Sequence, residues 1–252
     1  MSRGPLAGGL SGLGGPVPRD VIVLLAVVFA TFSIDVLTGG GLLFLRLTSA
    51  VWLSGYVWQL ATYAFTGYGA PSLWILLELL ILFWFGKDVF WRLGRKRFWR
   101  TLAWAVLGAA LAAVAVDLAL RLLGFPLGPP YLIMQGQRIL LAILIAAFAA
   151  LYADATIYLF FVLPLRARWF LWIEILFAFI AFLGTRDLPG FAGICAAVGI
   201  TYAVLRHGGP GRGLRHAWLR LRQRGLQRRL ERERKKRGFR VVRGDDGGPW
   251  LH

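Results

Sequence analysis

The stretch TLAWAVLGAALAAVAVDLALRLL, residues 101–123, decides the fold class of this chain. It is long enough to cross a bilayer as a helix, since about 20 mainly apolar residues suffice. The same character extends over all 252 residues, of which 58% are hydrophobic, against about 45 to 50% apolar residues in soluble domains. The mean hydropathy is +0.65. The sequence therefore predicts an integral membrane protein.

Five further apolar runs accompany this stretch, so the sequence predicts an all-α membrane protein built as a bundle of six transmembrane helices. The fourth run has only 14 residues, and its helix either starts inside the bilayer or extends back through residues 131–134. Residues 40–71 are fairly apolar but are broken by five glycines and a proline. We expect a structured, partly embedded loop there, between the first two helices. The predicted helices are 21–37, 73–90, 101–123, 139–152, 169–184 and 188–205.

The basic residues predict an orientation. If the first helix runs outward, all but four of the 29 Lys and Arg residues fall on the cytoplasmic side. Both termini are then cytoplasmic by the positive-inside rule. The first 19 residues are rich in Gly and Pro, and the run that follows lacks a small-residue cleavage site, so no cleavable signal peptide is expected. We expect a multi-pass protein in the lipid bilayer of a bacterial inner (cell) membrane.

Composition divides the chain into a Gly/Pro-rich cytoplasmic tail (1–19), the membrane domain (20–206) and a basic cytoplasmic tail (207–252). The basic tail lies next to the cytoplasmic leaflet and is predicted to bind anionic lipid. Nucleic acid is a less favoured partner, because aromatic residues do not alternate with basic ones there as in a stacking platform. The single cysteine, Cys195, excludes an internal disulfide and is expected to pack between helices.

Few residues of the membrane domain suit catalysis. The three histidines, His207, His216 and His252, all lie in the basic tail, and the last serine is Ser72, so no Ser and His pair is expected inside the membrane. No HExxH pair is present, and neither a metal site nor a cofactor is predicted. A proton-sharing pair of aspartates is disfavoured, because no aspartate follows a Gly-x-Gly motif. The aspartates considered are Asp35, Asp117, Asp154 and Asp187.

Four short stretches together resemble the rhomboid family of intramembrane serine proteases. They are VWQLATYAF (57–65), LLELLILFWFG (76–86), WRLGRKRF (91–98) and IYLFFVLPLRARWFLW (157–172). The resemblance covers about residues 20–206 and implies a six-helix, rhomboid-like bundle with both termini cytoplasmic. It also implies a serine nucleophile at the start of a short fourth helix and a histidine base in the sixth. An asparagine and a histidine of the second helix would stabilise the oxyanion.

None of these family residues stands at its matching position in this chain. The resemblance places Arg138 at the nucleophile, Asp187 at the base, and Glu78 and Trp74 at the two oxyanion positions. A guanidinium stays protonated and cannot act as a nucleophile, and an aspartate without a serine to activate has no role in acyl transfer. The resemblance therefore implies a pseudoprotease, with no catalytic residues, that binds a transmembrane or membrane-associated client protein.

The three charged substitutions have signs that could compensate one another. We hypothesise a buried network of Glu78, Arg138 and Asp187 that joins the second, fourth and sixth helices, because Arg138 offers five donors in a planar fork. Three simpler interpretations stand beside it. Glu78 could be protonated and merely packed, Asp187 could be a solvated N-cap of the sixth helix, and Arg138 could extend to the outer interface. Asp117 and Glu174 have no assigned role and are expected to pair between helices.

Two other functions remain open from the sequence. The first is an active rhomboid-type intramembrane serine protease. The second is a small transporter or channel whose intramembrane charges line a path for an ion or a polar solute. The sequence lacks an inverted repeat and matching Gly/Pro-broken helices, and this disfavours the transporter.

Overall fold

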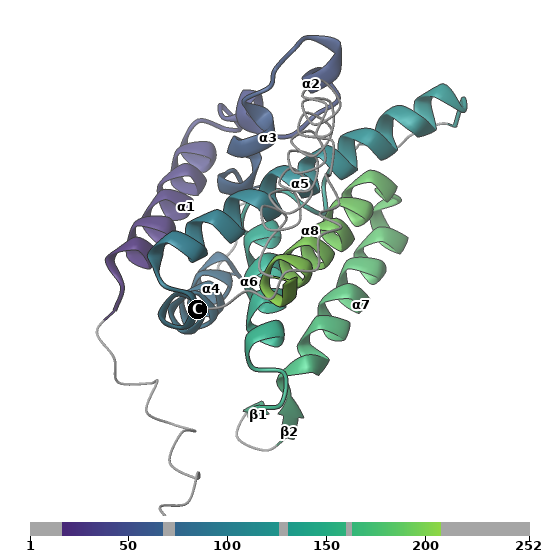
Figure 1. Cartoon of the computed structure of the whole chain (residues 1–252). Helices are drawn as coiled ribbons and strands as arrows, with labels where there is room; N and C mark the ends of the chain where they lie inside the picture. Colours follow the sequence, from purple (N-terminus) through teal and green to yellow (C-terminus); the bar gives the residue numbers. More distant parts are fainter. Residues whose placement is uncertain (1–16, 68–73, 126–130, 160–162, 208–252) are drawn as a thin grey trace, which may run out of the picture. The chain divides into compact units, whose positions relative to one another are not determined.

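The computed structural model describes residues 17–67, 74–125, 131–159 and 163–207 (Figure 1). Contacts between residues divide the chain into two units, Met1–His207 and Gly208–His252, and all of the described residues belong to the first. The predicted basic tail lies outside the described residues except for His207, and so does most of the predicted N-terminal tail. The prediction that the basic tail binds anionic lipid falls in the same undescribed part.

Each of the six apolar runs forms a helix. Among the described residues, four helices are long and apolar enough to cross a membrane, namely α1, α5, α7 and α8. α4 carries Glu78, Lys87 and Asp88, and the 15 residues of α6 span about 22 Å, less than the ~30 Å of a hydrocarbon core. A helical membrane protein is thus confirmed, whereas the count of six spans stays a prediction. The six helices are α1 (Arg19–Leu37), α4 (Trp74–Leu93), α5 (Arg95–Leu122), α6 (Gln137–Leu151), α7 (Ala167–Thr185) and α8 (Leu188–His207).

The connection between α1 and α4 contains short helical turns over its described part, residues 38–67, whereas its partial embedding in the bilayer stays a prediction. Leu47, Tyr63 and Ala64 are buried in it, and the Tyr63 hydroxyl donates a hydrogen bond to the carbonyl of Val106 on α5 (2.8 Å). The backbone of this loop is therefore fixed against the helices by its own side chains. Its helical turns are η2 (Leu43–Leu45), α2 (Ala50–Leu53), α3 (Gln59–Thr62) and η3 (Tyr63–Phe65).

A short antiparallel hairpin connects α6 to α7 and was not predicted from the sequence. Its strands are β1 (Thr156–Leu159) and β2 (Leu163–Arg166), with Thr156 opposite Arg166. The amide of Ala167 donates a hydrogen bond to the carbonyl of Ala155 (2.9 Å) and closes the base of the hairpin. β1 begins with the β-branched and aromatic sequence Thr-Ile-Tyr, which favours an extended backbone.

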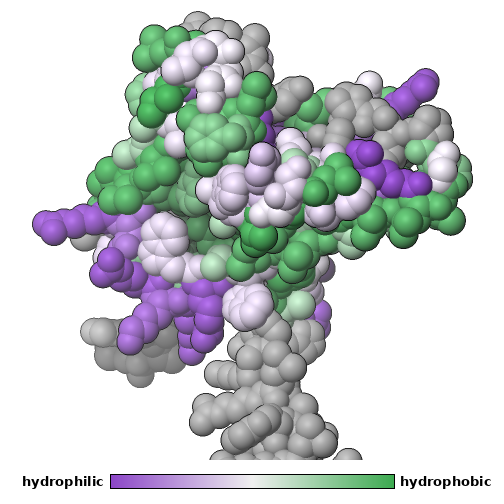
Figure 2. Space-filling model, turned by 90° about the horizontal axis from the view of Figure 1, so that it is seen from above, coloured by the Kyte–Doolittle hydropathy of each residue, from purple (hydrophilic) through white to green (hydrophobic). Residues whose placement is uncertain are grey.

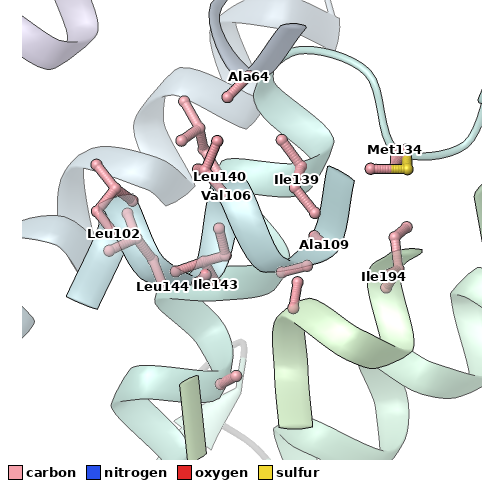
Figure 3. Close-up of a cluster of buried hydrophobic side chains, with 14 of the residues drawn as sticks. Ala64, Leu102, Val106, Ala109, Met134, Ile139, Leu140, Ile143, Leu144 and Ile194 are labelled. Carbon is pink, nitrogen blue, oxygen red and sulfur yellow. The ribbon is translucent and has the colours of Figure 1, made fainter. Parts of the chain in front are cut away.

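The short helix α6 lies at the centre of the helical core. It contacts α4, α5, α7 and α8, and nine of its 15 residues are buried. Figure 3 shows Leu140, Ile143 and Leu144 of α6 in one cluster with Leu102 and Val106 of α5. The central position of α6 explains why its run is apolar on all sides.

α5 and α8 approach each other closely through small residues. A Cβ atom added at Gly108 of α5 would lie 2.3 Å from Cδ1 of Ile200, and one added at Gly193 of α8 would lie 2.4 Å from Sδ of Met134 and 3.2 Å from Cβ of Ala113. Small residues at such contacts let helix backbones come together without a hydrophobic driving force in lipid.

On the face seen in Figure 2 the surface is largely apolar, and hydrophilic residues gather in a few places.

Candidate functional site

Asp187 is the N-cap of α8 and is almost completely buried, with 1% of its surface exposed. Its Oδ1 accepts a hydrogen bond from the amide of Gly190 in the first turn (2.7 Å). Oδ1 also accepts from the amide of Tyr131 (3.0 Å), and Oδ2 accepts from the amide of Ile133 (3.0 Å). The N-cap interpretation is therefore confirmed in its geometry, but the carboxylate is enclosed by protein rather than solvated. It joins the start of α8 to the segment before α6.

The glycine three residues after the cap has a steric reason. A Cβ atom at Gly190 would lie 2.1 Å from Oδ2 of Asp187, and that carboxylate is held in place by three backbone amides. The Asp-Leu-Pro-Gly sequence at 187–190 is consequently explained by helix capping alone.

Arg138 lies in the first turn of α6, and its side chain is exposed. It forms no hydrogen bond and no ion pair with any residue that the structure describes. Arg138 has a favourable Coulomb interaction with the carboxyl group of Glu174 on α7. Arg138 is thus associated with the fifth of the six long helices, whereas the sequence suggested the second and the sixth.

Glu78 and Trp74, the two positions matched to the oxyanion residues, lie on α4. Glu78 is half-buried, and its Oε2 is enclosed without a hydrogen-bond partner among the described residues. Trp74 begins the helix and is 69% exposed.

The hypothesised network of Glu78, Arg138 and Asp187 is wrong. No ion pair joins any two of these residues within the described ranges. The physical reason lies in Asp187, because its oxygens already accept three backbone amides and this leaves little capacity for a guanidinium. Asp117, which was expected to pair between helices, forms its ion pair with Arg121 of the same helix.

A polar cluster that the sequence interpretation missed surrounds Asp117 of α5, which is fully buried. Its Oδ2 accepts a hydrogen bond from Nε of Arg121 (3.1 Å) and one from Nε1 of Trp52 on α2 (3.4 Å). The guanidinium of Arg121 also lies over the Trp52 ring, 5.9 Å from its centroid. The i to i+4 spacing of Asp117 and Arg121 in an otherwise apolar helix was the signal that could have revealed this pair.

Tyr131 connects this cluster to the cap of α8. Its backbone has a positive φ of 71°, and its amide donates to Asp187. The Tyr131 hydroxyl and Oδ1 of Asp117 are both buried, and neither has a hydrogen-bond partner among the described residues. Burial, and then the neighbouring carboxylate of Asp117, raise the pKa of Tyr131, so this hydroxyl keeps its proton. These contacts join α2, α5, α8 and the segment before α6. The residues, here named the Asp117 cluster, are Asp117, Arg121, Trp52, Tyr131 and Asp187.

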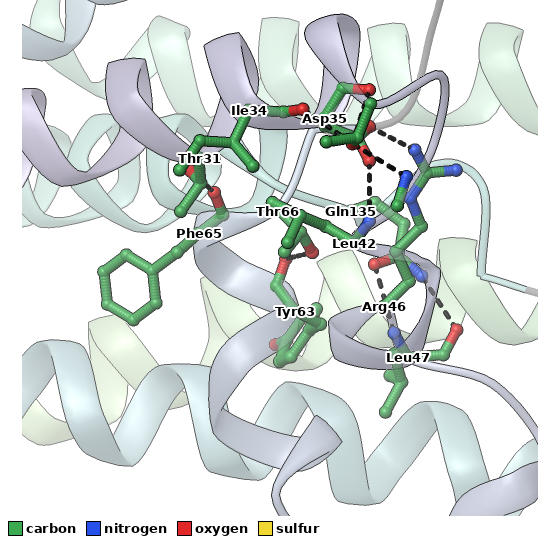
Figure 4. Close-up of polar contacts among 12 residues, drawn as sticks. Thr31, Ile34, Asp35, Leu42, Arg46, Leu47, Tyr63, Phe65, Thr66 and Gln135 are labelled. Atoms are coloured by element: carbon green, nitrogen blue, oxygen red, sulfur yellow. Dashed lines mark hydrogen bonds and ion pairs between the residues drawn. The ribbon is translucent and has the colours of Figure 1, made fainter.

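Buried side-chain amides hold the loop against the start of α6. Gln135 donates from Nε2 to the carbonyl of Leu47 (2.8 Å) and accepts at Oε1 from the Leu47 amide (3.3 Å), as Figure 4 shows. Gln59 accepts in the same way from the amide (3.2 Å) and the hydroxyl (3.0 Å) of Thr48. Nearby, the ion pair of Asp35 and Arg46 is almost buried, with 7% and 11% of the side chains exposed. These contacts explain how a loop rich in glycine adopts one conformation.

Gly136 lies at the point where the loop meets α6. Its amide donates to the carbonyl of Tyr63 (2.8 Å), and its φ is +58°. A Cβ atom there would lie 2.5 Å from the carbonyl oxygen of Thr66. Only glycine fits both the backbone conformation and this close approach.

Within the described residues there is no group of three or more His, Cys, Asp or Glu side chains that could hold a metal ion. Comparison of the sequence with models of known protein families and with curated proteins gives no match. The geometry therefore has to carry the functional argument. It consists of a buried polar cluster around Asp117, a capped helix at the position matched to a base, and an exposed arginine at the position matched to a nucleophile.

Proposed function

We propose that this chain is a rhomboid-like integral membrane protein that lacks protease activity and binds a transmembrane or membrane-associated client. One observation carries the proposal: neither residue at the two matched catalytic positions is arranged for acyl transfer. Asp187 caps α8 with both carboxylate oxygens, and Arg138 is an exposed cation. Acyl transfer needs a nucleophile and a base in hydrogen-bonding reach of each other, and this pair supplies neither.

The proposed topology has six spans, with α4 and α6 included, and both termini in the cytoplasm of a bacterial cell. Its support is the distribution of charge. The start of α1, the α4–α5 turn and the start of α7 carry exposed basic residues and lie toward one end of the bundle in Figure 1. Two arginines toward the other end have carboxylate partners, since Arg46 pairs with Asp35 and Arg121 with Asp117. Arg138 and Arg186 toward that end have no ion pair among the described residues, but exposed Lys and Arg residues are more numerous at the end assigned to the cytoplasm.

The client site is proposed to lie between α4 and α7, beside Arg138. Both helices pack on α6, but in the described part of the chain they do not pack along each other. The rings of Phe85 and Phe170 bring them together near the end of α4 and the start of α7, with centroids 5.9 Å apart. Beyond this contact α7 is little covered, and Ala167 and Ala178 are its buried residues. A client helix would cover this apolar face.

Site-specific photocrosslinking in membranes tests the client site. A photoreactive phenylalanine analogue is placed at Leu77 on α4 or at Phe177 on α7, both exposed, and at exposed Leu111 on α5 as a control. We expect the same discrete protein adducts from Leu77 and Phe177 and none of them from Leu111. Equal adducts from all three positions would contradict a site between α4 and α7.

Labelling with a fluorophosphonate probe tests the loss of protease activity separately. We expect no covalent labelling of the membrane domain, because Arg138 cannot be phosphonylated in place of a serine. Labelling that maps to residues 20–206 would contradict the loss of activity and would favour an active serine protease.

A further inference from the structure

The connection between α4 and α5 is a tight turn that gathers basic side chains. α4 ends at Leu93 and α5 begins at Arg95, so Gly94 alone joins them, and its φ of +73° is the left-handed conformation that glycine allows. Five cationic side chains on the two flanking helix ends are exposed. These residues, named the basic turn, are Arg92, Arg95, Lys96, Arg97 and Arg100.

Little of the charge of the basic turn is neutralised. Asp20 accepts from Nε of Arg95 (3.0 Å), but 76% of the Arg95 side chain stays exposed. The other four residues of the basic turn form no hydrogen bond or ion pair with any residue that the structure describes. The positive end of the α5 helix dipole and the negative end of the α4 dipole meet at Gly94, so the attraction for an anion rests on the side chains.

The neighbouring side chains place the basic turn at the level of a membrane interface. Trp91 is 53% exposed, and Trp99 donates from Nε1 to Asp20 (3.1 Å), which fixes it beside Arg95. Within one to two turns of Arg95, α5 becomes an apolar span with exposed Trp104 and Leu107. Tryptophan favours the boundary between headgroups and acyl chains, so the cations beside it lie among the phosphates.

From this juxtaposition we propose that the basic turn is a binding site for the phosphate headgroup of an anionic phospholipid, with Trp91 in contact with the upper acyl chain. Arginine fits a phosphate with two parallel N–H donors, and the site offers four arginines and one lysine within nine residues. A soluble phosphate compound or a nucleic acid would use the cations but would leave the exposed Trp91 and the adjoining apolar surface uncovered. The site is independent of client binding and consists of residues other than those of the basic tail.

Native mass spectrometry of the full chain in detergent tests the proposal, with phosphatidylglycerol and phosphatidylcholine of identical acyl chains as probes. Detergent removes the effect of membrane orientation, so a purely topological role of the charges has no influence. We expect at least five-fold tighter binding of the first phosphatidylglycerol than of phosphatidylcholine. Equal binding of the two lipids would overturn the proposal.

Variants locate the site. The change Arg92→Gln, Lys96→Gln, Arg97→Gln and Arg100→Gln keeps the Arg95 pair with Asp20. It should remove most of the preference for phosphatidylglycerol, while the contribution of the basic tail is unchanged. The pair Arg166→Gln and Arg168→Gln, which removes exposed charges at the start of α7, is the control and should leave the preference unchanged. A loss of the same size in both variants would mean diffuse attraction and would overturn a defined site.

Two further measurements hold if the four-residue glutamine variant fails to fold. The first replaces each arginine of the basic turn by lysine, which keeps the charge but removes the bidentate geometry, and we expect a two- to five-fold weaker preference. The second uses the unmodified chain. Glycerol phosphate and a short single-stranded DNA are offered as competitors in solution. If either displaces phosphatidylglycerol at equal concentration, the site is for a soluble anion and the lipid proposal fails.

Discussion

At the scale of the residue, the three backbone amides on Asp187 make the clearest stability prediction. Asp187→Ala leaves the buried amides of Tyr131, Ile133 and Gly190 without acceptors. A lost cap costs about 1 kcal/mol, and each unsatisfied buried group costs about 1 to 3 kcal/mol, so we expect a loss of about 3 kcal/mol or more. Asp187→Asn keeps one acceptor oxygen and should lose less. Unfolding by denaturant in detergent measures both.

Gly190 offers an internal check on this interpretation. Gly190→Ala should destabilise the parent, because its Cβ would meet the fixed Asp187 carboxylate. In the Asp187→Ala background the same substitution should have almost no effect. A double-mutant cycle without coupling between the two positions would contradict the cap geometry.

Arg138 carries the opposite expectation. It has no ion pair in the described part of the chain, so Arg138→Leu should leave the free energy of unfolding within about 1 kcal/mol or raise it, since a charge in an apolar helix is unfavourable. Arg121→Leu is the matched control. It strands the buried carboxylate of Asp117 and should cost about 3 to 5 kcal/mol. Thermal unfolding in the same detergent ranks the two, and a larger loss at Arg138 would revive the discarded network.

At the scale of the element, the six long helices follow from the sequence, because an apolar run of spanning length has few alternatives to a helix in lipid. The hairpin does not follow, since strands of four residues are too short to be resolved in a pattern averaged over about 20 residues. The site was predicted only in part. Sequence shows that Asp187 and Arg138 are unusual, but it does not show which backbone amides reach a carboxylate. Three amides, two of them more than fifty residues away along the chain, decided against the network.

The junction of the loop with α6 gives the prediction at this scale. Gly136→Ala combines a strained positive φ with a Cβ atom 2.5 Å from the Thr66 carbonyl oxygen, so the start of α6 should detach from the loop. Gly124→Ala is matched for φ, at +73°, but a Cβ there meets nothing within 4 Å, and it should cost only about 1 to 2 kcal/mol. We expect the Gly136 variant to lose clearly more stability and to become sensitive to protease within residues 38–67. Equal losses would mean that the close approach has no energetic weight.

At the scale of the whole molecule, the uneven distribution of positive charge predicts how the chain lies in the membrane. In a Cys195→Ala background, Arg97→Cys in the basic turn should react with a membrane-impermeant maleimide only after the cells are opened. Leu53 is exposed on α2 next to Trp52, and Leu53→Cys should react in intact cells. The reverse pattern would invert the proposed topology, while leaving the bundle itself intact.

The capping role of Asp187 also bears on history. Under the proposed relationship, a lineage that lost its nucleophile could recover activity by a single change only while the remaining positions stayed free to change back. Here position 187 is committed to the fold, because a histidine there cannot accept three backbone amides at once. Each step toward a restored dyad would pass through a less stable protein. The cap therefore acts as an evolutionary ratchet, and we expect that Arg138→Ser combined with Asp187→His yields an unstable chain rather than an enzyme.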